Sequence, residues 1–169
     1  MDNNQQKQKI TKVTEVLEEV YTVSDLNNYI RMLDNLKPVI FKETANLAQT
    51  LQQELPPKLA NYISTYAETT NLNLNDQTDA QRLIQQIVYI FHLVPSAEIT
   101  VPAPLTNKQI IKICKWWREK TNKAVILNIK IDPDLIAGIR IGFEGKYVDY
   151  SLSTWLQEKG KKHLDKVQI

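Results

Sequence analysis

The chain has 169 residues with a formal net charge of +2, and 43% of its residues are hydrophobic. This length is enough for one or two domains with a sizeable core. The four glycines are spaced so that neither a GxxxxGK[ST] phosphate loop nor a GxGxxG dinucleotide turn can be written. One cysteine and two histidines exclude an internal disulfide, a cysteine-based zinc cluster and an HExxH site. The composition therefore predicts a protein that is not an enzyme and has no cofactor or metal.

The first nine residues are polar and are expected to form a flexible N-terminus. They lack the apolar core of a signal peptide and the Arg and Ser bias of a transit peptide. Apolar runs elsewhere are far shorter than the ~20 residues that span a bilayer. The sequence predicts a soluble protein that stays in the compartment where it is made.

Composition changes near Pro95. Residues 1–95 carry a net charge of −3, whereas residues 96–169 carry +5 and hold all the glycines and tryptophans. The sequence thus predicts a helical bundle over 10–95 and an α/β domain over 96–169.

Within the first part, apolar residues recur every three or four positions, which is typical of amphipathic helices. Ser24 is expected to cap the second helix and Pro38 to end it, while Thr78 or Asp79 is expected to cap the fifth. The five predicted helices cover residues 10–20, 24–37, 38–54, 56–66 and 78–91. Short helices of this kind must bundle to bury their apolar faces.

The second part alternates apolar and polar residues, the period of half-buried strands. Thr106 and Gln109 predict a capping box at the start of a helix. Gly138 lies inside a predicted strand, where a second backbone segment is expected to approach closely. Strands are predicted over 97–101, 125–131, 135–143 and 147–149, with a last helix from Ser151 to about Val167. The predicted class is α+β: an N-terminal helical bundle, then a small mixed β-sheet domain with flanking helices.

Three features of the sequence are candidate sites. Asp132, Asp134 and Asp149 could surround a cation, but each also suits a turn beside a strand, which we favour. Trp116 and Trp117 are adjacent on a helix and point about 100° apart, so one is expected to pack on the sheet and the other to be partly exposed. An exposed tryptophan suits a partner-binding anchor, although a ring lying on its own domain fits as well. Lysines at 159, 161, 162 and 166 could contact phosphate or complement a helix dipole.

The second part resembles the delta subunit of F-type ATP synthases, called the oligomycin-sensitivity-conferring protein in mitochondria. The similarity covers roughly residues 97–157 and follows the order of segments 97–101, 104–106, 125–127, 131–138 and 148–151. A helical part before a sheet part is also the family's domain order. The family's Gly-Gly is Ala137-Gly138 here, and its Asp-Gly-Ser is Asp149-Tyr150-Ser151, so residue 150 is expected to keep an ordinary negative φ.

The resemblance implies a non-catalytic stator subunit with one copy per complex. Since the sequence lacks a transit peptide, a bacterial complex is expected, with the subunit peripheral to the cytoplasmic side of the plasma membrane. Its helical part would hold N-terminal segments of the alpha subunits, and its C-terminal part the end of the b-type stalk. The helix from Ser151 is a further candidate for the stalk side. The candidate partner-binding residues are Leu17, Val20, Leu26, Ile30 and Leu33 for the first partner, and Trp116 and Trp117 for the second. Two alternatives stay open: a nucleic-acid-binding module that uses the basic second half, and a stalk subunit of a related rotary ATPase.

Overall fold

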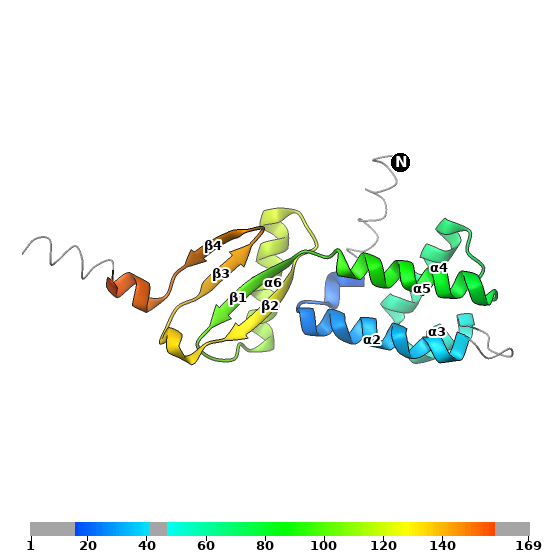
Figure 1. Cartoon of the computed structure of the whole chain (residues 1–169), viewed down its shortest axis with the longest axis horizontal. Helices are drawn as coiled ribbons and strands as arrows, with labels where there is room; N and C mark the ends of the chain where they lie inside the picture. Colours follow the sequence, from blue (N-terminus) through cyan, green and yellow to red (C-terminus); the bar gives the residue numbers. More distant parts are fainter. Residues whose placement is uncertain (1–15, 41–46, 158–169) are drawn as a thin grey trace, which may run out of the picture. The chain divides into compact units, whose positions relative to one another are not determined.

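The computed structural model describes residues 16–40 and 47–157, which form two compact units divided after Val94 (Figure 1). The predicted apolar residues before position 16, the lysines from 159 to 166 and the end of the last helix lie outside these ranges. Within the described ranges, no helix combines the length and apolarity needed to cross a membrane.

Unit 1 contains short helices whose apolar faces meet in one core. The elements are η1 (Leu17–Glu19), α2 (Val23–Ile40), α3 (Leu47–Glu54), α4 (Pro57–Thr70) and α5 (Gln77–His92). Helix α2 packs mainly on α5, and α3 packs on α4 (Figure 1). The largest fully buried side chains of the unit are Leu17, Leu33, Leu51, Leu59, Ile63, Leu83, Ile84, Ile87 and Phe91. This confirms the helical character predicted for the first part of the chain.

Several helix boundaries of unit 1 differ from the predicted ones; for example, α4 continues to Thr70. Helix α2 is capped by Thr22, whose Oγ1 accepts from the Asp25 amide at 3.1 Å while the Asp25 carboxylate accepts from the Thr22 amide at 3.0 Å. Ser24 already lies inside the helix, so the prediction that it is the cap is wrong. Pro38 lies within α2 rather than ending it. Helix α5 is capped by Asp76, because that carboxylate accepts from the Asp79 amide at 2.9 Å.

Unit 2 is a four-stranded mixed sheet with one helix beside it. The elements are β1 (Ser96–Val101), α6 (Asn107–Thr121), β2 (Ile126–Ile131), η2 (Pro133–Leu135), β3 (Arg140–Phe143) and β4 (Lys146–Asp149), followed by a helical turn over 152–157. The strand order is β2-β1-β3-β4, with β1 parallel to β2 and the other pairs antiparallel. Helix α6 runs along one face of this sheet (Figure 1). The predicted fold class is confirmed.

The strand predicted over 135–143 is shortened, because the backbone turns before it. Asp132 caps η2 by accepting from the Asp134 amide at 3.1 Å. Ile136 follows with a φ of 60°, and the Ala137 amide donates to the Leu135 carbonyl at 2.7 Å, so these residues form a γ-turn. Strand pairing begins only after Gly138, whose φ is 99°. This turn takes residues 135–139 out of the predicted strand.

Candidate interaction surfaces

The candidate partner-binding residues of unit 1 lie mostly in its core. Leu17, Val20, Leu26 and Leu33 are buried, and only Ile30 is partly exposed. A buried side chain cannot touch a partner unless the bundle opens. These three leucines and one valine therefore have a packing role in the structure. Their contribution to a partner groove therefore stays a prediction, and direct contact is expected of Ile30 alone.

The two tryptophans of α6 divide as expected. Trp116 is 50% exposed, whereas Trp117 is partly buried and its ring lies 4.9 Å from that of Phe143 on the sheet. The two indole rings meet edge to face, with centroids 5.6 Å apart and an interplanar angle of 84°. Trp117 thus anchors α6 to the sheet, and Trp116 stands outside as a candidate contact.

Further exposed apolar side chains follow β3 in the chain. The sequence did not predict which residues these are. Six large apolar side chains within ten residues are exposed around the edge strand and the helical turn after it, with Tyr147 and Val148 on opposite faces of the sheet. We call them the β4 strip: Tyr147, Val148, Tyr150, Leu152, Trp155 and Leu156. The sequence predicts a partner-binding role for the helix after Ser151 but not for the residues of β4. Apolar residues in a short strand normally indicate burial. Concentrated exposed apolar surface marks interaction sites in soluble proteins.

Backbone contacts hold the β4 strip against the turn that precedes β3. The Tyr150 amide donates to the Ile139 carbonyl at 2.8 Å, and the Leu152 amide donates to the Ala137 carbonyl at 2.9 Å. Tyr150 keeps an ordinary negative φ, as expected for an aromatic residue where the family has glycine. The strip is therefore fixed to the sheet rather than left as a loose tail.

An ion-pair network braces the same region. Arg140 donates from Nη1 to Asp132 at 2.9 Å and from Nε to Asp149 at 3.1 Å. Asp149 also accepts from the Ser151 amide at 2.7 Å. The Ser151 hydroxyl and amide, with Thr154 and Arg140, hold the pKa of Asp149 well below its ordinary value, at about 2. The carboxylates of Asp132 and Asp149 thus accept hydrogen bonds from turn amides and from Arg140. Among the described residues, no group of three or more His, Cys, Asp and Glu could hold a metal ion.

Strand β4 forms an edge of the sheet and leaves backbone groups unpaired. Because Tyr150 pairs with β3, and alternate residues of an antiparallel ladder point the same way, the amides of Tyr147 and Asp149 face outward. In the sheet as described, no strand lies beyond β4. The edge can accept an added extended segment or be covered by a partner helix.

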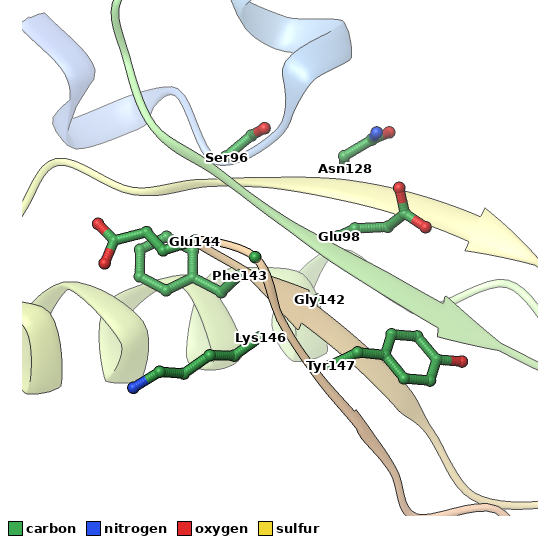
Figure 2. Close-up of a pocket in the computed structure, with 9 residues that line it drawn as sticks. Ser96, Glu98, Asn128, Gly142, Phe143, Glu144, Lys146 and Tyr147 are labelled. Atoms are coloured by element: carbon green, nitrogen blue, oxygen red, sulfur yellow. The ribbon is translucent and has the colours of Figure 1, made fainter.

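The face of the sheet opposite α6 contains a shallow polar hollow of about 400 Å³ (Figure 2). Gly142 forms part of its lining, beside Glu98 and Tyr147. Figure 2 shows Glu98 and Tyr147 projecting from the sheet, with α6 behind it. The two carboxylates of the hollow are already paired: Glu98 with Lys130 at 2.8 Å, and Glu144 with Lys123. The negative charge of these two carboxylates is thus compensated, and Lys146 is a further charged side chain of the lining.

A helical bundle followed by a mixed sheet with an exposed apolar edge defines a protein built to contact other proteins. The particular family follows from comparison of the whole sequence. The model of the ATP synthase delta (OSCP) subunit family matches residues 1–162, so the chain belongs to that family. This result agrees with the resemblance of segments 97–157 and extends it across the helical part.

Individual relatives are delta subunits of bacterial ATP synthases. The chain is 31% identical over 88 residues to "ATP synthase subunit delta" of Bradyrhizobium sp. (strain ORS 278), which is 52% of this chain and 47% of the relative. The corresponding protein of Nitrobacter hamburgensis is 32% identical over the same shares. The chain thus matches about half the length of these curated relatives. Among solved structures, a chain of the Polytomella F-ATP synthase is 22% identical, covering 44% of this chain and 95% of that one, with a TM-score of 0.37.

Proposed function

We propose that the protein is a non-catalytic stator subunit of an F-type ATP synthase, joining the catalytic head to the peripheral stalk. The observation that carries the proposal is the match of the delta (OSCP) family model across both units. A stator subunit performs no chemistry; it holds two partners together against the torque of rotation. The protein would lie at the cytoplasmic side of a bacterial plasma membrane, attached through the complex, with one copy in each.

Unit 2 is proposed to hold the C-terminal end of the b-type stalk subunit through the β4 strip. The strip combines exposed apolar side chains with an unpaired strand edge, and its turn is braced by Arg140. A partner helix or strand that covers these side chains removes apolar surface from water, which stabilises the complex by roughly 25 cal/mol per Å² before the costs of association.

Unit 1 is proposed to hold N-terminal segments of the alpha subunits, as helix-in-groove recognition requires. Ile30 on α2 is the candidate contact that keeps exposed surface, while Leu17, Val20, Leu26 and Leu33 shape the bundle behind it. Residues 1–95 carry a net charge of −3 and residues 96–169 carry +5, so the two parts favour partners of different charge. Replacing Ile30 by Glu should weaken binding of an alpha N-terminal peptide, and unchanged affinity would remove Ile30 from the interface.

The decisive experiment is rebinding of the full chain to membranes that carry the synthase and have been stripped of their own copy of this subunit. We expect saturable binding, and recovery of ATP-driven proton pumping measured by quenching of a pH-sensitive dye. If the wild-type chain neither binds nor restores pumping, the proposed function is wrong. Tight, salt-sensitive binding of the chain to duplex or single-stranded DNA instead would favour the nucleic-acid alternative.

A matched pair of variants tests the β4 strip within the same assay. Leu156 and Ile131 are both 52% exposed, but only Leu156 belongs to the strip, whereas Ile131 ends the opposite edge strand β2. Leu156→Glu should weaken rebinding at least about tenfold, since a charge would be buried against the partner. Ile131→Glu should change it less than about threefold. Equal effects of the two substitutions would remove the strip from the interface.

A further inference from the structure

The outer face of α6 is strongly cationic. We define this face by its exposed side chains Lys108, Lys112, Lys115, Trp116 and Lys120. Their spacing places them away from Cys114, which is fully buried against the sheet, and along one side of the helix. Lys108 and Lys120 are twelve residue steps apart, which is about 18 Å along the helix at 1.5 Å per residue. The four lysine side chains therefore form a row along one side of α6.

These lysines differ from Lys123 and Lys130, which have acidic partners in the part of unit 2 that the structure describes. Lys123 pairs with Glu144, and Lys130 pairs with Glu98 at 2.8 Å. Within residues 16–40 and 47–157, no carboxylate lies within 4.0 Å of the ammonium groups of Lys108, Lys112, Lys115 or Lys120. Glu119 is the single acid of α6. Four like charges on one helix repel one another, so an anionic occupant is favourable there.

Trp116 supplies an apolar contact in the middle of this row. Lys112 lies one turn before it and Lys120 one turn after it. Its ring is half exposed yet held in place, because Trp117 meets it edge to face and Trp117 itself rests on Phe143. A rigid aromatic side chain flanked by cations is the arrangement of an interface anchor.

We propose that the outer face of α6 binds an acidic amphipathic helix of another subunit, as a contact surface separate from the β4 strip. Carboxylates spaced by three and four residues along such a helix would face the lysine row, and an aliphatic side chain between them would cover Trp116. A bilayer is a poorer match, since an interfacial helix needs a broad apolar face and this one exposes a single large apolar side chain. The proposal rests on the proposed function only in placing this helix within the same assembly.

The first test uses a labelled helical peptide with Glu at positions i, i+4, i+7 and i+12 and one Leu between them, titrated into the full chain. We expect binding that weakens with salt and is lost when the same residues are scrambled around the helix. Lys112→Gln with Lys115→Gln should reduce the affinity about tenfold. The charge-matched control, called the sheet control, is Lys123→Gln with Lys130→Gln, lysines that pair with Glu144 and Glu98. It should reduce the affinity less than twofold. Trp116→Ala should also weaken binding while leaving the salt dependence unchanged.

Several outcomes would overturn the proposal. Equal binding of the ordered and scrambled peptides, or equal losses in the two double variants, would mean that α6 attracts anions without recognising a helix. Tighter binding of duplex DNA, or of vesicles of phosphatidylglycerol and phosphatidylcholine, would assign the face to a nucleic acid or a membrane instead.

Rebinding to stripped synthase membranes separates this proposal from the proposed function. The Lys112→Gln and Lys115→Gln variant should rebind about tenfold more weakly than the wild type, while the sheet control rebinds normally. If the wild type rebinds and the α6 variant matches it, the α6 proposal fails and the stator function stands. If the wild type does not rebind at all, the stator function fails, and the peptide titration alone decides whether α6 recognises an acidic helix.

Discussion

Gly138 lies directly against the backbone of Tyr150. A Cβ atom added to Gly138 would lie 2.3 Å from the Tyr150 carbonyl oxygen and 2.7 Å from the Ser151 Cα atom. The φ of Gly138 is also 99°, a conformation that residues with a side chain rarely adopt. This contact joins the turn before β3 to the middle of the β4 strip, so the position of the strip depends on the absence of a side chain at residue 138.

Replacing Gly138 by Ala should therefore destabilise the protein by about 3 kcal/mol or more, from the combined clash and backbone strain. Urea denaturation followed by circular dichroism measures this. Gly142→Ala is the control: the nearest atom would be 3.6 Å away and the φ is ordinary, so the loss should stay below about 1 kcal/mol. Equal losses for the two substitutions would show that the close approach is not what makes Gly138 necessary.

The capping box of α2 predicts a second difference between neighbouring residues. Thr22→Ala removes the hydroxyl that accepts from the Asp25 amide and should lower the free energy of unfolding by about 1 kcal/mol. Ser24→Ala, at an exposed position inside the helix, should change it by less than about 0.5 kcal/mol. A larger loss at Ser24 than at Thr22, measured by thermal or urea unfolding, would restore the cap that the sequence suggested.

Tyr62 carries a buried hydroxyl for which the described residues offer no hydrogen-bond partner. Burial, with a smaller contribution from Tyr66, raises the pKa of this phenol. Tyr62→Phe keeps the ring that stacks near Phe91 and removes the unsatisfied group, so stability should rise by up to about 1 kcal/mol.

Tyr66→Phe is the matched control for that substitution. The Tyr66 hydroxyl donates to Gln86 Oε1 at 3.3 Å, so its loss should cost about 0.5–1 kcal/mol. Stability that falls equally in both variants, as measured by urea unfolding, would show that the Tyr62 hydroxyl has a partner in solution.

Asp149 predicts an acid-dependent contribution to stability. Its folded pKa is depressed to about 2, first by Ser151 and then by Thr154 and Arg140, so the unfolded state binds the proton more readily. The stabilisation is complete above the ordinary carboxyl pKa near 4 and is lost as the pH falls through about 2. The stability difference between wild type and Asp149→Asn should thus be constant from pH 8 to about 5 and shrink below it. A difference that grows on acidification would contradict this account; Asp134→Asn, the same charge change at an exposed turn, is the control.

Local patterns were sufficient where neighbouring residues decide the structure. The Thr106 and Gln109 capping box is present at the start of α6, and the alternation of β1 appears as alternating burial. The two-residue turn between β3 and β4 is equally local, with positive φ at both Glu144 and Gly145. Each of these features depends on contacts within a few residues, which the sequence displays directly.

Other features could not be predicted, because distant segments decide them. The apolar spacing of α2 is the same for a core face and for a partner groove, and only the packing of α2 on α5 shows that Leu26 and Leu33 are buried. Pro38 reads as a helix end, yet α2 continues to Ile40, whose side chain is buried. The helix propensity of proline does not include the free energy gained by burying Ile40.

The sequence by itself determined the two-part organisation, the fold class and the family, because composition, hydrophobic period and motif order are properties of the chain. The tertiary structure decided which apolar residues remain in water. The exposure of the β4 strip follows from its place at the sheet edge, and the exposure of Trp116 follows from the side of α6 that packs on the sheet. Burial depends on which segments contact one another, and these tertiary contacts exist only in the folded chain.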